Sequence, residues 1–161
     1  MSRVAKKKIK NKLLPADPVY NNRLISRLIN KVMRNGKKTS AEREVYQALK
    51  IIEEKIKTEP IKVFELAIQT VSPRMEVRPR RVGGASYQIP VEVKGNRKIH
   101  LALKWLIDAA RKRSNKEHHH FSEKLAAELI EASKGLGEAI KKRDYTHKMA
   151  DANKAFAHFR W

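Results

Sequence analysis

The sequence predicts a mainly α-helical protein, a bundle of about six helices with one protruding two-stranded β-hairpin. Apolar residues recur at helical spacing along most of the chain, but over residues 75–93 the pattern changes to alternation. The length of 161 residues suits one domain, and a hydrophobic content of 41% is enough for a core. We expect a single helical domain over residues 13–161, with the hairpin at about residues 74–93, preceded by a basic, disordered arm over residues 1–12.

Three helices are expected before the hairpin. The first should end at Asn35 and Gly36, a pair typical of a left-handed helix cap. Thr39 and Glu42 have the spacing of a capping box for the second helix, and the sequence KTEP at residues 57–60 should end it. The third helix should span about residues 61–71.

The hairpin is predicted from the sequence VRPRRVGGASYQIPVEV at residues 77–93. Gly83 and Gly84 lie between two alternating runs, as in a tight turn. Pro79 and Pro90 have no N–H to donate to a ladder, so neither strand should lie inside a wide sheet. We therefore expect a narrow ribbon that projects from the helices.

Three further helical segments should follow the hairpin. The first begins after residues 94–96 and carries a basic row opposite its apolar side, which Asp108 interrupts: Arg97, Lys104 and Arg111. A helix is expected at about residues 121–133, and a last one, partly off the core, from about Glu138. The core of the whole bundle should include Leu28, Leu49, Phe64, Leu103 and Leu106.

The charge of the chain indicates a polyanionic partner. Lys and Arg number 37 against 17 Asp and Glu, a formal net charge of +20. Nucleic acid fits such a charge better than a membrane surface does. A membrane-bound helix needs an exposed apolar face, whereas the apolar faces of these helices should be buried in a globular core. The first residues are either a solubilising tail or an arm that orders on phosphates, through Arg3, Lys6, Lys7, Lys8 and Lys10.

Other kinds of site find little support in the sequence. The chain has no cysteine, which excludes disulfides, thiol catalysis and Cys-based zinc sites. His118, His119 and His120 are adjacent, so their rings splay apart rather than meet at a metal, and we expect solvated turn residues. No nucleophile elbow or phosphate loop is present, so we expect no enzyme, no cofactor and no small-molecule substrate. A DNA-architectural protein and an RNA-modifying enzyme remain the alternatives to a structural RNA-binding protein.

Four spaced blocks give the chain a resemblance to a known family. They are GKKTSAE at 36–42, RRVGGASYQIPVEV at 80–93, ALKWLIDAARKR at 102–113 and THKMADANKAFAHFRW at 146–161. With them the chain resembles, over residues 15–161, the family of small-subunit ribosomal protein seven, of bacterial and organellar type. The resemblance implies direct binding to the 3′ major domain of small-subunit rRNA, organisation of the subunit head, and a position near the exit tRNA site and the mRNA path. It also implies ribosomal proteins nine and eleven as neighbours, and a ribosome in bacterial cytoplasm or in an organelle.

The resemblance further implies roles for residues at matching positions. The expected rRNA contacts outside the hairpin are Lys37, Lys38, Arg111, Lys112 and Arg113. From the hairpin, RNA should be bound by Arg78, Arg80 and Arg81, with Gly83 and Gly84 allowing close approach at the tip. The tRNA side should be faced by Lys141, Lys142, Arg143 and His147. The neighbouring protein should meet the segment that holds Ala155, Phe156 and Phe159.

Overall fold

The structure, a computed structural model, describes residues 14–159, so the expected N-terminal arm lies outside it. The helices are α1 (Arg23–Val32), α2 (Lys38–Ile56), α3 (Pro60–Val71), α4 (Asn96–Lys112), α5 (Phe121–Ser133), α6 (Glu138–Ala152) and the short 3-10 helix η1 (Lys154–Phe159). The strands are β1 (Met75–Val82) and β2 (Ala85–Glu92), which form one antiparallel hairpin. The predicted fold class, mainly α with a single hairpin, is confirmed.

The core lies among α1 to α5. The buried side chains form one cluster to which each of these helices contributes, with α5 packed against α2, α3 and α4. All five residues expected in the core are at most 1% exposed: Leu28, Leu49, Phe64, Leu103 and Leu106. Burial of each such side chain contributes about 1.5–3 kcal/mol, so this cluster is the main source of stability. Helix α6 buries only Ala139, Ile140 and Ala150, as expected for a helix partly off the core.

The capping box predicted for the second helix is wrong. Helix α2 begins at Lys38, so Thr39 lies within its first turn, and no side chain caps this end. Asn35 and Gly36 both have positive φ, and the tight turn that they form brings the N–H of Lys37 to the carbonyl of Arg34 at 3.0 Å. This turn sets the start of the helix one residue before Thr39, and Glu42 instead pairs with Lys38 at 3.4 Å.

A capping box does occur at α5. His120 is the N-cap residue, and the carboxylate of Glu123 accepts the N–H groups of His119 at 3.0 Å and His120 at 3.3 Å. These backbone bonds, together with the nearby histidines, lower the pKa of Glu123. His120 therefore has a structural role at the start of a helix.

The hairpin is a two-stranded ribbon, as predicted. Gly83 and Gly84 form the turn with φ of 58° and 87°, the positive values that a tight hairpin turn requires. Residues directly opposite each other share a face of the ribbon. Arg80 opposes Tyr87 and Arg78 opposes Ile89, whereas Val77 opposes Pro90 on the other face. The alternating apolar residues of β1 and those of β2 thus fall on opposite faces of the ribbon, so that Arg78 and Arg80 lie opposite Ile89 and Tyr87.

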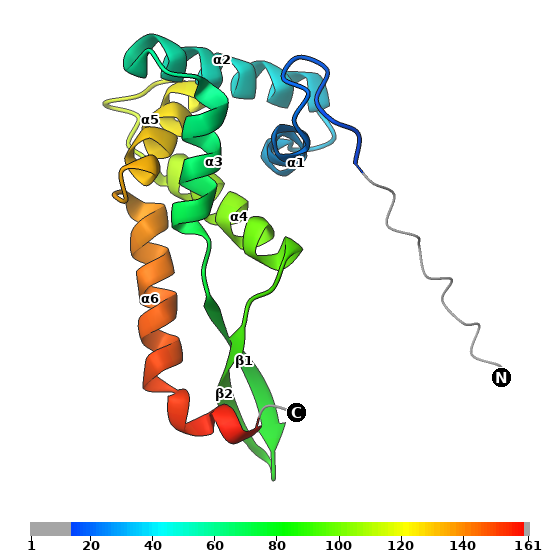
Figure 1. The fold of residues 1–161 in the computed structure, drawn as a ribbon, viewed down its shortest axis with the longest axis vertical. Helices are drawn as coiled ribbons and strands as arrows, with labels where there is room; N and C mark the ends of the chain where they lie inside the picture. The colour runs from blue at the N-terminus through cyan, green and yellow to red at the C-terminus, as the bar shows by residue number, and fades with distance from the viewer. Residues whose placement is uncertain (1–13, 160–161) are drawn as a thin grey trace, which may run out of the picture.

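The ribbon projects from the bundle but does not stand alone. Helix α6 runs beside it, and η1 turns across β2 near the tip (Figure 1). The ring of Tyr87 packs between two aromatic side chains of η1, with centroids 5.2 Å from Phe156 and 5.3 Å from Phe159. The ribbon, α6 and η1 therefore form one arm below the bundle.

Candidate nucleic-acid interface

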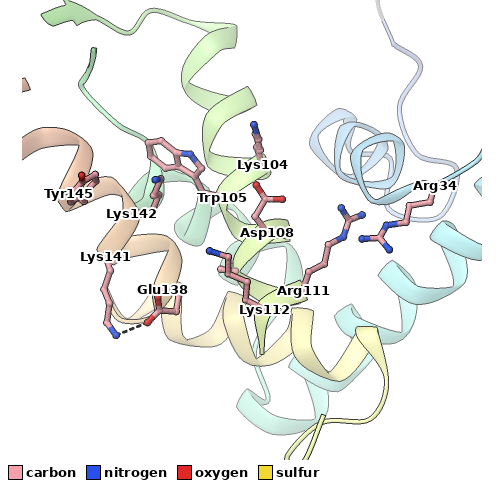
Figure 2. Close-up of a pocket in the computed structure, with 11 residues that line it drawn as sticks. Arg34, Lys104, Trp105, Asp108, Arg111, Lys112, Glu138, Lys141, Lys142 and Tyr145 are labelled. Atoms are coloured by element: carbon pink, nitrogen blue, oxygen red, sulfur yellow. Dashed lines mark hydrogen bonds and ion pairs between the residues drawn. The ribbon is translucent and has the colours of Figure 1, made fainter. Parts of the chain in front are cut away.

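A hollow with a volume of about 760 Å³ lies between α4 and α6 (Figure 2). We call it the basin. Its walls carry six cationic side chains, two carboxylates and two aromatic rings: Arg34, Lys104, Arg111, Lys112, Lys141, Lys142, Asp108, Glu138, Trp105 and Tyr145. Its predominant charge is positive, so an anionic ligand is the one that it fits.

Helical spacing explains why these residues meet. On α4, Lys104, Asp108 and Arg111 follow one another at intervals of four and three residues, which places them on one face. On α6, Glu138, Lys141, Lys142 and Tyr145 have the same kind of spacing, while Ala139 and Ile140 turn into the core. The two helices pack against each other, so the polar faces form the two walls of the basin.

A second row of cations lies along the contact between α1 and α4, and we call it the seam. Arg27 donates to Asn96 Oδ1 at 3.0 Å, and Lys31 Nζ lies 3.4 Å from His100 Nε2. Burial, Lys31, Arg97 and Lys104 together lower the pKa of His100. Burial and the charge of Lys104 likewise lower the pKa of Lys31, against an opposing effect of Asp108. Burial is the larger cause of both shifts, and the neighbouring cations of the seam add to it.

Arg111 joins the seam to the basin. Its Nη2 donates to the carbonyl of Val32 at the end of α1, at 3.1 Å. Burial and the neighbouring charge of Arg34 lower its pKa. A smaller hollow on the other side shares Arg34 and Arg111 and is also lined by Lys37. The predicted residues Lys37, Lys104, Arg111, Lys112, Lys141 and Lys142 are therefore brought to one continuous surface.

Arg34 was missed by sequence reasoning as a site residue, although it lines both hollows. Its position on the basic side of the first helix was visible in the spacing, but the sequence did not show that this side faces α4. Lys38, in contrast, lies apart from the basin, beside Glu42 and the loop that precedes α1.

The guanidinium of Arg113 is held inside the protein. It binds Glu128 at 2.6 Å and also Glu131, and the side chain of Glu128 is 0% exposed. Burial alone would lower the pKa of Arg113, but the hydrogen bonds and charges of Glu131 and Glu128 outweigh it and raise the pKa. Glu128 Oε1 also accepts the N–H of Ala139 at 3.1 Å, so the same carboxylate caps the start of α6. The RNA contact expected of Arg113 stays a prediction.

A second carboxylate anchors the base of the ribbon. Glu76, in β1, is 7% exposed. Arg78 donates to it at 2.7 Å from β1, and Arg97 donates to it at 3.1 Å from the first turn of α4. Burial would raise the pKa of Glu76, but these hydrogen bonds prevail and lower it. Two of the predicted RNA-binding arginines thus also tie the ribbon to the bundle.

The outer part of the ribbon is exposed. Arg80 and Arg81 are neighbours in β1 and so point to opposite faces, Arg80 to the face that carries Tyr87. No atom lies within 4 Å of a Cβ built on Gly83 or Gly84, so the tip is open to a partner. This region is separate from the basin.

Arg143 and His147 lie on another side of α6. Arg143 donates to the carbonyl of Thr70 and, at 2.8 Å, to Asp144. His147 Nε2 accepts the N–H of Arg74 at 3.0 Å. Both residues therefore hold α6 against the end of α3 and the start of β1. Of the expected protein-contact residues, Ala155 is exposed, while Phe156 and Phe159 are half-buried against Tyr87.

The described residues were also compared with the requirements of membrane-spanning helices and of metal sites. None of the helices described is long and apolar enough to cross a membrane. Within residues 14–159, no group of three or more His, Cys, Asp or Glu could hold a metal ion.

Comparison with known proteins gives the family. The model of ribosomal protein S7p/S5e matches residues 3–154. The small ribosomal subunit protein uS7 of Thermomicrobium roseum is 52% identical over 154 residues, covering 96% of this chain and 97% of the relative. The uS7 of Dictyoglomus thermophilum is 55% identical over 148 residues, with 92% and 93% covered. The uS7 of Thermotoga petrophila is 53% identical over 148 residues, with 92% and 94% covered. A basic helical bundle with one β-ribbon and this degree of identity identify the chain as a bacterial-type member of the S7p/S5e family of small-subunit ribosomal proteins.

Proposed function

We propose that the chain binds the 3′ major domain of small-subunit rRNA directly, organises the head of the subunit, and lies near the exit tRNA and the mRNA path. The observation that carries this proposal is the convergence of cations from α4, α6 and the turn between α1 and α2 on one surface. The family is one of structural, non-enzymatic ribosomal proteins, so the function is binding without catalysis. The bacterial relatives support a bacterial cytoplasmic ribosome as its setting.

The basin and the seam supply the rRNA affinity. Cations that neutralise phosphates release condensed counterions, which makes binding favourable and sensitive to salt. Selectivity comes from shape, because the grooves of folded RNA present phosphates in a geometry that differs between junctions. The cations of the seam and of the α4 wall of the basin lie on helices that contribute to the core, so folding sets their spacing before RNA arrives.

The arm below the bundle takes the second part of the function. Arg80, Arg81 and the open tip at Gly83 and Gly84 face the exit tRNA and mRNA, together with α6. The segment of η1 around Ala155 meets a neighbouring protein, and ribosomal proteins nine and eleven are the proposed neighbours. The outer part of the ribbon lies at the far end of the molecule from α1 and α2 (Figure 1), and its arginines line neither hollow, which supports this division between rRNA on one side and tRNA or mRNA on the other.

The test measures binding to a 3′-major-domain rRNA fragment and to an unrelated folded RNA of equal length while the salt concentration is raised. Between 50 and 200 mM salt, a surface that neutralises several phosphates should lose roughly three orders of magnitude in affinity. The preference for the rRNA fragment should persist throughout. Affinity that does not change with salt, or equal affinity for the two RNAs, would contradict the proposal.

A second measurement places the protein in the cell. After a high-salt wash, the chain should still sediment with small ribosomal subunits, because shape-specific contacts remain when non-specific ones are screened. Recovery of the protein with nucleoid DNA, or free in the supernatant, would count against the ribosomal assignment.

A further inference from the structure

We propose that the basin takes one unstacked nucleotide of the bound RNA, with its base against Tyr145 and Trp105 and its phosphates at the cationic end. This inference rests on the RNA-binding function proposed above and names the part of the RNA that the basin receives. A nucleotide that leaves its stack has an exposed aromatic face and two flanking phosphates. The basin offers a complementary surface to each.

The aromatic end of the basin is formed by two helices. Trp105 comes from α4 and is half-buried against the core, while Tyr145 comes from α6 and is 57% exposed. Among residues 14–159, Tyr145 is the only Phe, Tyr or Trp that is mostly exposed. Lys142 Nζ lies over its ring, 5.4 Å from the centroid, and the ring lines the hollow.

The cationic end lies across the basin. Figure 2 shows Trp105, Lys142 and Tyr145 at one side and Arg34 with Arg111 at the other, with Lys112 between them. Glu138 does not oppose a phosphate, because it is paired with Lys141 at 2.6 Å. Arg34 lies near Arg111, and its charge adds to burial in lowering the pKa of Arg111. A phosphate placed there would relieve this repulsion.

The size of the hollow argues for one nucleotide rather than a helix. A volume of about 760 Å³ falls within the range of sites that enclose a small ligand, roughly 300–1,000 Å³. A duplex cannot enter such a hollow, and bases inside a duplex offer no face to a protein ring. Single-stranded bases, in contrast, stack on exposed aromatic side chains whatever their identity. The basin therefore fits an unpaired nucleotide at a bulge or junction.

The test uses Trp105 as a reporter. The chain has two tryptophans, so Trp161→Phe leaves Trp105 as the only one. This variant is titrated with a short single-stranded RNA, with an abasic strand of the same length, and with inorganic phosphate. We expect the base-containing RNA to quench the fluorescence of Trp105, because a stacked base contacts the ring. The abasic strand and phosphate should leave it nearly unchanged.

Substitutions at the aromatic end separate the base from the backbone. Tyr145→Leu should weaken binding of the base-containing strand about five- to one-hundred-fold, as expected for loss of one stacked base, and should leave abasic binding nearly unchanged. Tyr145→Phe should retain wild-type affinity. Lys112→Ala should weaken both strands alike, and Lys62→Ala, which removes an exposed cation on α3, is the matched control without effect.

The outcomes distinguish this inference from the proposed function. The wild-type chain could bind the rRNA fragment specifically and with salt sensitivity while the fluorescence of Trp105 stays unchanged. That result, or equal affinity of Tyr145→Leu and wild type, would overturn the inference but not the proposed function. Loss of preference for the rRNA fragment in the wild-type chain would overturn the function itself. Because the fluorescence arm needs no change at Tyr145, it decides the question even if Tyr145→Leu alters the fold.

Discussion

Gly137 shows how one residue fixes a helix. It has φ of +100° and directly precedes α6, and a Cβ at this position would lie 2.9 Å from Glu128 Oε1. That oxygen accepts the N–H of Ala139, so it cannot move away without uncapping α6. The glycine is therefore required both by the backbone and by the buried carboxylate beside it.

Gly137→Ala should destabilise the protein by about 1–3 kcal/mol more than Gly135→Ala does. Gly135 also has positive φ, of 78°, and nothing lies within 4 Å of its added Cβ, so it reports the cost of positive φ without a contact. Gly137 adds both the contact with Glu128 and a backbone conformation, φ of 100° with ψ of 170°, that is essentially restricted to glycine. Urea unfolding of both variants measures the difference. Equal destabilisation would mean that Glu128 yields to the added methyl group and that the contact matters little.

The Glu76 carboxylate predicts a pH dependence. Its pKa is lowered in the folded protein by Arg78 and Arg97 from an ordinary value of 4.5. A lowered folded pKa means that the pairing stabilises the protein fully above the unfolded pKa and is lost as pH falls through the folded pKa. We expect Glu76→Gln to cost about 1 kcal/mol at pH 7, since both arginines are half-exposed and screened by solvent.

The measurement compares the unfolding free energies of wild type and Glu76→Gln from pH 7 to pH 3. The difference between them should be constant above about pH 5 and should shrink as the pH falls below 4.5. Glu92→Gln, at an exposed position on the ribbon, is the matched control. A difference that grows toward low pH would show that the carboxylate is destabilising in the folded state.

At the scale of elements, the ribbon and η1 behave as one unit. The register sets Arg80 on the face that carries Tyr87, whose ring packs against η1, whereas Arg81 lies on the opposite face. A partner that approaches the ribbon from one side therefore meets only one of these two arginines. The alternation in the sequence predicted the two strands, but not which residues of β1 and β2 share a face. That depends on the pairing register, which the two-residue turn sets.

Replacing Arg80 and Arg81 together by Ala should leave the bundle folded and rRNA assembly largely intact, because neither side chain contributes to the core. The handling of tRNA or mRNA at the exit side should change. Thermal unfolding and subunit assembly test the first expectation, and tRNA binding to reconstituted subunits tests the second. The two single variants should differ from each other, and global unfolding of the double variant would instead assign the arginines a structural role.

For the whole molecule, the sequence predicted the elements well and their contacts poorly. Most helix positions and the five core residues followed from apolar periodicity, because burial of one face is what selects that pattern. The end predicted for the first helix at Asn35 and Gly36 is wrong, because α1 ends at Val32 and these two residues form the turn before α2. The capping box failed because its spacing is short and common, and a tight turn decided the start of α2 instead. Charges were visible, but their partners were not. Hydrogen bonds to groups at least fifteen residues away in the sequence are made by Arg113, Arg143 and His147.

The basin illustrates the same limit at the level of the site. The basic row of α4 was predicted from its seven-residue spacing, and the cations of α6 were expected only through family resemblance. Their meeting depends on the packing of α4 against α6, which no local pattern encodes. Tyr145 was not singled out because an exposed tyrosine has no distinctive sequence signal.

The buried carboxylate of Glu128 has a thermodynamic consequence for recognition. By bonding both to Arg113 and to the N–H of Ala139, it ties the start of α6 to α5 and to the end of α4 in the free protein. Preorganisation of this kind removes the entropic cost of ordering a helix from the association step. RNA binding therefore does not have to order the start of α6, because folding has already attached it to α5.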